Sequence, residues 1–293
     1  MKFEHVRSLT HNNAVYWSAF SPDGKRIATA SLDNMVKLWS TDDGQLLNTL
    51  KGHGDGVTFV GFLADGRIAT ASLDRSVRVW PADGGAATTT MLGHQDYVPA
   101  GAVARTGTLI VSGGFDKTVR LWDAQSGAAL AVLAGHDAQV QCVAVSSNGK
   151  LIASGGEDNT VRLWDAESKT LIKTINGHTR TVEGVAFSPD DSTLASAGAD
   201  GALMLWNTKG EKVTAAEAPT GKLKSVVFMP DGKSLVTGGA DGALRIWTVN
   251  VPREVFSVKA HRNTVYGVTV SADGKQLASS GFDRTIHVWS VSP

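Results

Sequence analysis

Three residue types that can together perform nucleophilic catalysis recur along this chain at fixed spacing. In a Ser-His-Asp triad the histidine takes the proton of the hydroxyl, and the aspartate orients the histidine. Here a histidine stands 22 residues before an aspartate, or 21 residues before it in one case, and a serine or threonine stands four residues before the same aspartate. The trios are His11, Thr29 and Asp33; His53, Thr70 and Asp74; His94, Ser112 and Asp116; His136, Ser154 and Asp158; His178, Ser196 and Asp200; and His261, Ser279 and Asp283.

The repetition of the trio argues against catalysis. A hydrolase needs one such site with an oxyanion hole, and the chain contains no nucleophile-elbow motif. A tryptophan also follows each of these aspartates by six residues, and Thr237, Asp241 and Trp247 keep the same register behind Pro219. We therefore interpret the trios as buried hydrogen-bond networks and expect no catalytic residue. The tryptophans in register are Trp39, Trp80, Trp122, Trp164, Trp206, Trp247 and Trp289.

These tryptophans are 41 or 42 residues apart, which reveals seven copies of one unit. A unit of this length needs its neighbours to bury its apolar face. Turn residues divide each unit into four short apolar segments, which in the first unit cover residues 14–20, 26–30, 36–40 and 45–50. Ser21-Pro22-Asp23-Gly24 is a typical turn between the first two segments. The pattern predicts seven blades of four strands each.

The units resemble the repeats of the WD40 family, which carry Gly-His near the start and Trp-Asp near the end. These dipeptides occur at Gly52-His53, Gly93-His94, Gly135-His136, Gly177-His178, Trp122-Asp123 and Trp164-Asp165. The resemblance covers essentially the whole chain and implies an all-β, seven-bladed β-propeller of four-stranded antiparallel blades, a single domain over residues 1–293. It also implies that residues 3–9 pair into the last blade and close the ring. Within each blade it implies a hydrogen-bonded chain of Trp, Ser or Thr, His and Asp.

Composition limits the class of protein. With 293 residues, 42% of them hydrophobic, and 28 Lys and Arg against 28 Asp and Glu, the chain can form an ordered domain but shows no basic footprint for nucleic acid. No signal core or membrane-spanning run is present, and Cys142, the single cysteine, is expected to be a buried thiol. We expect a cytoplasmic monomer that binds neither nucleic acid nor membrane and needs no cofactor.

Two places depart from the repeat. Pro219 stands where the other units have histidine, so we expect an incomplete network in the sixth unit, with Trp247 and Asp241 each short of a partner. His5 and His287 lie outside the pattern, on neighbouring strands of the closing blade. A two-histidine surface site is one interpretation of this pair, but we prefer two solvated imidazoles and expect no metal site.

Residues that vary at corresponding places of the units are the candidates for binding. In the family, the loop after each histidine and the turn with each aspartate lie on one face of the ring, here called the top face. Three positions of each unit are expected to project there: three and five residues after the histidine, and the residue before the aspartate. The apolar candidates, here called the apolar arc, are Tyr16, Leu32, Leu73, Tyr97, Phe115, Tyr266 and Phe282. The polar candidates, the polar arc, are Gln139, Gln141, Glu157, Glu183, Lys222 and Lys224.

Aromatic side chains gathered on one face are typical of a binding hot spot, although these could also pack against one another around the channel mouth. We expect a non-catalytic scaffold that binds a protein or peptide partner on the top face. Two alternatives stay open. One is an enzyme at the channel mouth with Glu157 and Glu183 as an acid and base pair. The other is a docking or sensor module of a larger signalling protein. Separately, the Ser-Pro-Asp-Gly-Lys turn resembles those of bacterial members of the family.

Overall fold

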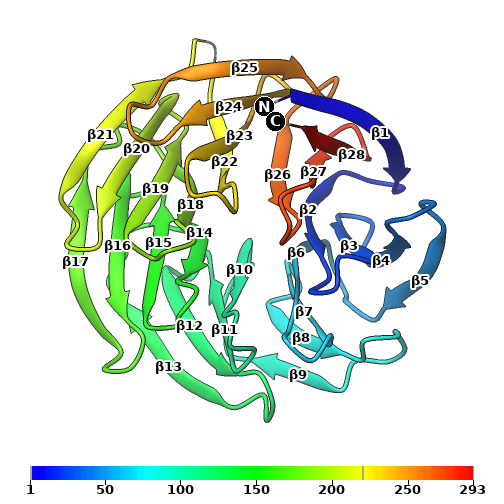
Figure 1. Cartoon of the computed structure of the whole chain (residues 1–293). Helices are drawn as coiled ribbons and strands as arrows, with labels where there is room; N and C mark the ends of the chain where they lie inside the picture. The colour runs from blue at the N-terminus through cyan, green and yellow to red at the C-terminus, as the bar shows by residue number, and fades with distance from the viewer. Residues whose placement is uncertain (1, 220, 293) are drawn as a thin grey trace.

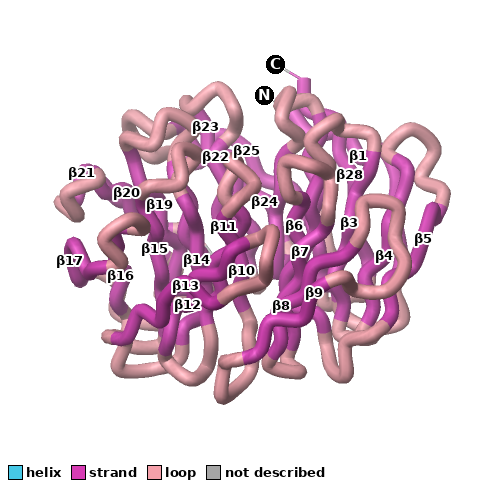
Figure 2. Tube along the Cα trace, turned by 90° about the horizontal axis from the view of Figure 1, so that it is seen from below, coloured by secondary structure: helices cyan, strands magenta, loops and turns pink. Residues whose placement is uncertain are grey.

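Seven four-stranded antiparallel sheets stand in a ring around a central channel (Figure 1). This computed structural model describes residues 2–219 and 221–292, so residues 1 and 293, the limits of the predicted domain, lie outside the described residues. In the view from the side, the strands run through the thickness of the ring and the loops gather on its two faces (Figure 2). The predicted seven-bladed β-propeller is confirmed.

Each blade is one sheet whose strands follow one another in sequence from the channel outward. Blade 1 contains β2 (Val15–Phe20), β3 (Arg26–Ser31), β4 (Met35–Ser40) and β5 (Leu46–Lys51). Blade 2 contains β6 (Val57–Phe62), β7 (Ile68–Ser72), β8 (Ser76–Trp80) and β9 (Thr89–Leu92). Blade 3 contains β10 (Ala100–Val103), β11 (Leu109–Gly113), β12 (Thr118–Asp123) and β13 (Ala129–Ala134). The four segments predicted for the first unit agree with β2 to β5 to within about one residue at each end.

The remaining blades repeat this order, and the last blade draws its fourth strand from the start of the chain. Blade 4 contains β14 (Val140–Val145), β15 (Leu151–Gly156), β16 (Thr160–Asp165) and β17 (Thr170–Asn176). Blade 5 contains β18 (Val182–Phe187), β19 (Thr193–Gly198), β20 (Ala202–Asn207) and β21 (Lys212–Glu217). Blade 6 contains β22 (Leu223–Phe228), β23 (Ser234–Gly239), β24 (Ala243–Thr248) and β25 (Glu254–Lys259). Blade 7 contains β26 (Val265–Val270), β27 (Gln276–Gly281), β28 (Thr285–Ser292) and β1 (Lys2–Thr10).

The first and last strands of the chain close the ring by pairing with each other. Strand β1 is antiparallel to β28, from Lys2 opposite Ser292 to Thr10 opposite Thr285. Two residues of β1, Phe3 and Leu9, lie in the core, at 7% and 4% exposure. The predicted closure by the first strand is confirmed, and β1 is the outer strand of blade 7.

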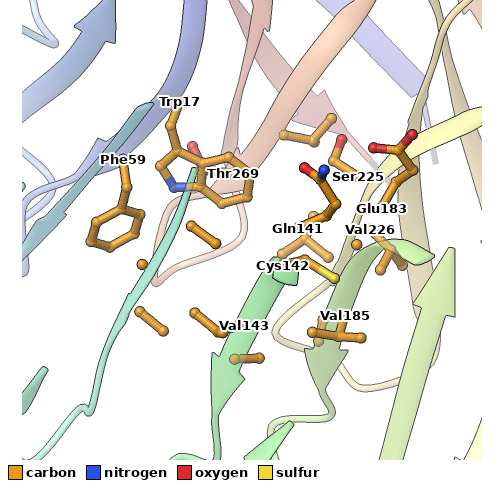
Figure 3. A pocket seen from close by; sticks show the side chains of 18 of the residues that line it. Trp17, Phe59, Gln141, Cys142, Val143, Glu183, Val185, Ser225, Val226 and Thr269 are labelled. Atoms are coloured by element: carbon orange, nitrogen blue, oxygen red, sulfur yellow. The ribbon is translucent and has the colours of Figure 1, made fainter. Parts of the chain in front are cut away.

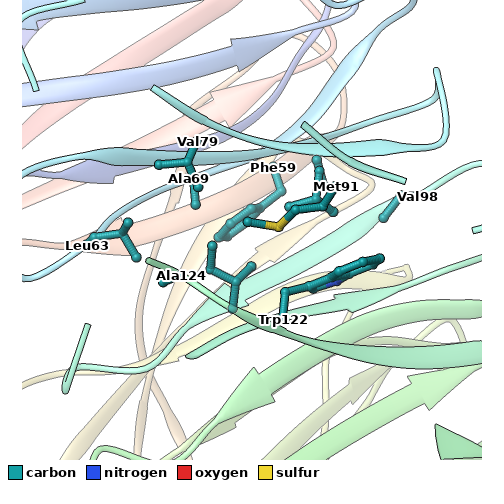
Figure 4. Close-up of a cluster of buried hydrophobic side chains, with 11 residues drawn as sticks. Phe59, Leu63, Ala69, Val79, Met91, Val98, Trp122 and Ala124 are labelled. Atoms are coloured by element: carbon teal, nitrogen blue, oxygen red, sulfur yellow. The ribbon is translucent and has the colours of Figure 1, made fainter. Parts of the chain in front are cut away.

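The hydrophobic core lies between neighbouring blades. One cluster joins Phe59, Leu63 and Met91 of blade 2 to Trp122 of blade 3, and its side chains fill the space between the two sheets (Figure 4). The repeat tryptophans are all buried, and each of the seven clusters includes a repeat tryptophan of one blade and apolar residues of the blade beside it. Blades therefore stabilise one another in pairs around the ring, as expected for stacked repeats.

Candidate functional site

The recurring hydroxyl, histidine, aspartate and tryptophan residues form hydrogen-bonded tetrads in six blades. In blade 1 the Trp39 indole N–H donates to Thr29 Oγ1 at 2.9 Å, and the same oxygen lies 2.8 Å from His11 Nε2. His11 Nδ1 lies 2.9 Å from Asp33 Oδ2. Across the six tetrads these three distances stay within 2.8–3.0, 2.7–2.8 and 2.8–3.0 Å. The family's hydrogen-bonded chain is present.

The partners in blade 1 suit one protonation state. An indole N–H can only donate and an ionised carboxylate can only accept, so all three bonds are made when the Thr29 hydroxyl donates to His11 Nε2 and the His11 imidazole carries one proton, on Nδ1. Burial lowers the pKa of His11 despite the nearby Asp33 carboxylate. Burial alone would raise the pKa of Asp33, but hydrogen bonds from His11 and from the backbone N–H of Asn12 bring that pKa down to about 2. The blade 1 tetrad is therefore a neutral His11 beside an ionised Asp33.

The tetrad hydroxyls have no room for a substrate. Thr29, Ser154 and the equivalent serines and threonines are 0% exposed, and each oxygen is engaged by both the indole and the imidazole. A nucleophile must reach a carbonyl carbon, which these buried oxygens cannot do. The tetrads instead tie the loop after each histidine to the turn that carries each aspartate.

Blade 6 corrects the expectation of an incomplete network behind Pro219. Trp247 keeps its bond to the Thr237 hydroxyl at 2.9 Å, and Asp241 forms an ion pair with Arg245, whose Nη1 lies 3.2 Å from Asp241 Oδ1. An arginine in the same register lies 3.5–3.9 Å from the aspartate in blades 2, 3 and 4. Without an imidazole in between, Arg245 pairs directly with the Asp241 carboxylate, while Trp247 keeps the Thr237 hydroxyl.

The tetrads position two backbone segments side by side on the top face. In every blade the residue before the aspartate donates its N–H to the carbonyl of the residue three places after the histidine, or after Pro219. In blade 3, for example, the Phe115 N–H lies 2.8 Å from the Tyr97 carbonyl oxygen. Two of the three positions predicted to project from each blade are therefore neighbours.

The third predicted position lies at the channel mouth because of a β-bulge. In six blades the pairing of the innermost strand with the next strand skips one residue, which is five places after the histidine. A bulge residue is unpaired and its side chain is re-aimed. Blade 3 has Pro99 there, just before β10, where no ladder N–H is required. The bulge residues and Pro99 line the mouth of a cavity of about 490 Å³: Tyr16, Thr58, Pro99, Gln141, Glu183, Lys224 and Tyr266.

Several members of the apolar arc are in contact. Tyr16 and Tyr266 stack across the seam of blades 7 and 1, with ring centroids 4.3 Å apart, and Phe282 lies 6.2 Å from Tyr266. Burial, together with the mutual contact of the two phenols, raises the pKa of Tyr266 above its usual value. Tyr97 and Phe115 pair within blade 3 at 5.9 Å.

Leu32 and Leu73 lie on either side of Gly56. A Cβ at Gly56 would lie 2.5 Å from Leu32 Cδ2 and 3.4 Å from Leu73 Cδ1, so glycine is the residue that fits between these leucines. Tyr97 and Phe282 remain 41% and 50% exposed, whereas the other arc members are half-buried.

Four members of the polar arc form two side-chain pairs. Lys224 Nζ lies 2.6 Å from Glu183 Oε1, an ion pair between blades 6 and 5. Gln141 Nε2 donates to Glu157 Oε1 at 3.0 Å within blade 4. Lys222 is exposed and Gln139 is half-buried. The two carboxylates of the alternative enzyme interpretation thus have different partners, one a lysine and the other an amide.

The channel wall contains large side chains that the sequence reasoning missed. Trp17 and Phe59 lie on one side of the cavity, facing Cys142, Val143 and Val185 (Figure 3). A Cβ at Gly267 would lie 2.8 Å from Trp17, and one at Gly101 would lie 2.4 Å from Phe59, so each aromatic ring covers a glycine of the next blade. The sequence holds one sign of this wall: of the eight tryptophans, Trp17 alone lies outside the repeat register.

His5 and His287, the two histidines outside the tetrads, touch each other. Their rings lie 5.0 Å apart, centroid to centroid, and His5 Nε2 lies 3.2 Å from His287 Nδ1. Burial, followed by the neighbouring His261 and His5, lowers the pKa of His287 to about 4. Two separate solvated imidazoles do not describe this pair.

Comparison with known proteins identifies the repeat. The profile described as "WD domain, G-beta repeat" matches seven times, over residues 3–40, 44–81, 85–123, 127–165, 169–207, 210–248 and 252–290. Similar curated proteins include WD repeat-containing protein 86 of Homo sapiens (47% identity over 49 residues), Periodic tryptophan protein 2 of Arabidopsis thaliana (40% over 50 residues) and Ribosome assembly protein 4 of Saccharomyces cerevisiae (46% over 44 residues).

These likenesses extend over little more than one repeat. The aligned stretches cover 17%, 17% and 15% of this chain and 13%, 6% and 8% of the three relatives. In the described part of the chain, no helix has the length and apolar character needed to cross a bilayer.

Proposed function

This chain belongs to the WD40 repeat family, and from that premise we propose that it is a non-catalytic scaffold that binds a protein or peptide partner on its top face. The family membership supports an interaction role, and the arrangement of the top face supports the location. The name of the yeast relative places that protein in ribosome assembly, and assembly requires contacts between macromolecules. We propose that this chain also makes contacts with another macromolecule, and we assign no identity to that partner.

One observation carries the location: Tyr97 and Phe282 stay exposed beside aromatic neighbours that hold them in place. The Tyr97 ring contacts Phe115, and the Phe282 ring contacts Tyr266. Tyr266 is in turn stacked on Tyr16. A large ring that is already held loses little entropy when a partner covers it, and such residues dominate binding energy. The top face therefore offers two preformed apolar contacts on opposite sides of a polar mouth.

The channel mouth suggests how a peptide would be oriented. The cavity beneath it has a mainly apolar wall, while Lys224, Glu183 and Gln141 line the rim. A partner that places an apolar side chain on the apolar arc would bring its backbone amides near these rim groups. Polar groups at a rim set orientation and specificity more than affinity.

The proposal can be tested without knowing the natural partner. A random peptide library displayed on phage is selected on the wild-type protein, and the dissociation constants of the enriched peptides are measured by fluorescence anisotropy. We expect Tyr97→Ala and Phe282→Ala, separately and together, to weaken binding by about tenfold or more, as for truncation of a hot-spot residue. Circular dichroism checks that both variants are folded.

A matched control replaces equally exposed apolar residues elsewhere. Val132 of β13 and Val213 of β21 are 50% and 60% exposed on the outer strands, away from the top face. Val132→Ala with Val213→Ala should leave the dissociation constants within about twofold of wild type. If this control weakens binding while the top-face variants do not, the partner binds the outer rim and the proposed location is wrong.

A further inference from the structure

Three donor atoms converge where β1 pairs with β28. His5 Nε2 lies 3.2 Å from His287 Nδ1, and Ser8 Oγ lies 2.8 Å from His287 Nδ1 and 3.1 Å from His5 Nε2. The three atoms thus form a nearly equilateral triangle. His5 and Ser8 are exposed and His287 is half-buried, so the triangle is open to solvent on one side.

The separation of the two nitrogens in this triangle suits a shared metal ion. Imidazole nitrogens bind Zn²⁺ at about 2.0–2.1 Å, so two nitrogens on one tetrahedral ion are separated by roughly 3.3 Å. Two cis nitrogens on a square or octahedral ion such as Cu²⁺ or Ni²⁺ are about 3 Å apart. The observed 3.2 Å between His5 Nε2 and His287 Nδ1 falls in this range. Water can supply the remaining ligands from the open side.

We propose that the seam between β1 and β28 is a binding site for a divalent transition-metal ion of the zinc type. His5 Nε2 and His287 Nδ1 are its two protein ligands, and Ser8 Oγ holds a metal-bound water by a hydrogen bond. The ion joins two strands whose ligands are 282 residues apart in the chain. Metal binding therefore stabilises the pairing of β1 with β28, which closes the ring.

A second layer of residues orients His287 for this role. Its other ring nitrogen, Nε2, lies 3.3 Å from Thr285 Oγ1, and Thr285 Oγ1 donates to Asp283 Oδ1 at 2.6 Å. When Nδ1 is a ligand, Nε2 carries the proton and donates toward this hydroxyl and, through it, the carboxylate. Histidine ligands of metals commonly have such an oriented partner on the second nitrogen.

An alternative position for the ion, on the inner side of His287, is less suitable. His261, Asp283 and His287 also offer donor atoms within 4.8 Å of one another. However, His261 Nδ1 is bonded to Asp283 at 2.9 Å and His261 Nε2 to Ser279 at 2.8 Å, so a metal there would dismantle the blade 7 tetrad. The outer site uses nitrogens that no tetrad needs.

The site is particular to the closing blade. The register position of His287, four residues after the repeat aspartate, is occupied in blades 1 to 6 by Lys37, Arg78, Arg120, Arg162, Met204 and Arg245. A cationic or apolar residue there cannot bind the ion beside a histidine. These residues also supply the variants for a test, because they show which side chains the position accepts.

The experiment measures Zn²⁺ binding to the metal-stripped protein by titration calorimetry, and the thermal midpoint with and without Zn²⁺. Wild type should bind one ion per chain, and at about ten times the dissociation constant the thermal midpoint should rise by about 2 °C and return on addition of EDTA. No saturable binding to the wild-type protein would overturn the proposal.

Three variants locate the ion. His5→Leu, which copies Leu46 at the equivalent place of β5, and His287→Arg, which copies four other blades, should each weaken binding at least tenfold. Glu4→Gln, which removes an exposed carboxylate beside His5, is the control and should bind like wild type. Binding that survives His5→Leu but is lost in His287→Arg would place the ion in the inner group. Binding that survives both would place it elsewhere; either result contradicts the proposed site.

Discussion

Each tetrad is a directed chain of hydrogen bonds. In blade 1 the proton of Trp39 points to Thr29, that of Thr29 to His11, and that of His11 to Asp33. The residues match those of a catalytic triad, but the indole occupies the oxygen that would attack. Whether a Ser-His-Asp set is catalytic is thus decided here by what else touches the hydroxyl.

Removing the hydroxyl of one tetrad should be costly. Thr29→Val keeps the shape of the side chain but leaves the buried Trp39 N–H and His11 Nε2 without this partner. We expect a loss of about 2–3 kcal/mol in the free energy of unfolding, measured with urea, because each buried group without a partner costs about 1–3 kcal/mol. Thr29→Ser, the residue of blades 3, 4, 5 and 7, is the control and should stay within about 1 kcal/mol. Equal values for the two variants would show that the tetrad contributes little.

At the scale of elements, the bulged innermost strand keeps the residues that pair in the sheet apart from the residue that faces the channel mouth. The bulge leaves the ladder intact on both sides and frees one residue per blade to face the channel mouth. Because this residue is skipped in the ladder register, it can change type without disturbing the sheet. Tyr16, Thr58, Glu183 and Lys224 occupy equivalent bulges and differ completely in chemistry.

Strand β1 is the element on which closure depends. Deleting residues 1–9 removes the partner of β28 and takes Phe3 and Leu9 out of the core. We expect the thermal midpoint to fall by roughly 10 °C or more, since two large apolar side chains and a row of ladder hydrogen bonds are lost. Differential scanning calorimetry measures the change.

A peptide in trans separates the loss of β1 from other effects of truncation. A synthetic peptide of residues 1–10 should raise the midpoint of the truncated protein, whereas a scrambled peptide of the same composition should not. A truncated protein as stable as the full chain would contradict the role assigned to β1.

At the scale of the whole molecule, the ring has no privileged starting point. Blade 7 draws its outer strand, β1, from the opposite end of the chain, and Lys2 lies opposite Ser292. The clusters between blades are alike around the ring, so the seam can be moved.

A circular permutant tests this equivalence. Joining residue 293 to residue 1 by a short Gly-Ser linker and opening the chain between Gly85 and Ala86, both exposed, transfers the closing strand from blade 7 to blade 2, where β9 becomes the first strand. We expect the permutant to fold with a thermal midpoint within about 5 °C of wild type. A permutant that fails to fold, as seen by circular dichroism, would show that the native seam has a specific role.

Much of this fold could be predicted because one pattern is written seven times. The tryptophan register gave the blade count, and the alignment of residues 3–9 with the fourth segment gave the closure. The predicted adjacency on the top face also follows from the register, as Tyr97 and Phe115 show. Binding by these residues stays a prediction.

Contacts that depend on a particular pair of side chains could not be predicted. Arg245 pairs with Asp241 in blade 6, where the histidine is missing. A repeat pattern shows that the histidine is absent, but it does not show which side chain pairs with the aspartate instead. The stack of Tyr16 on Tyr266 and the cover of Gly267 by Trp17 join blades 1 and 7, residues about 250 places apart, where no local periodicity applies. The same holds for the geometry of His5 and His287, although their neighbouring strands were foreseen.

The pairing of β1 with β28 also has a consequence for biosynthesis. His5 leaves the ribosome 282 residues before His287, which at about 5–20 residues per second is a delay of roughly 15–60 s. Throughout that time β1 has no strand to pair with, and the growing arc of blades ends in an open edge. A chain whose translation stops early leaves β1 without its partner strand and the apolar sides of its end blades uncovered. The completed ring covers these surfaces. An unfinished chain exposes them, and exposed strands and apolar surface are what chaperones and proteases bind.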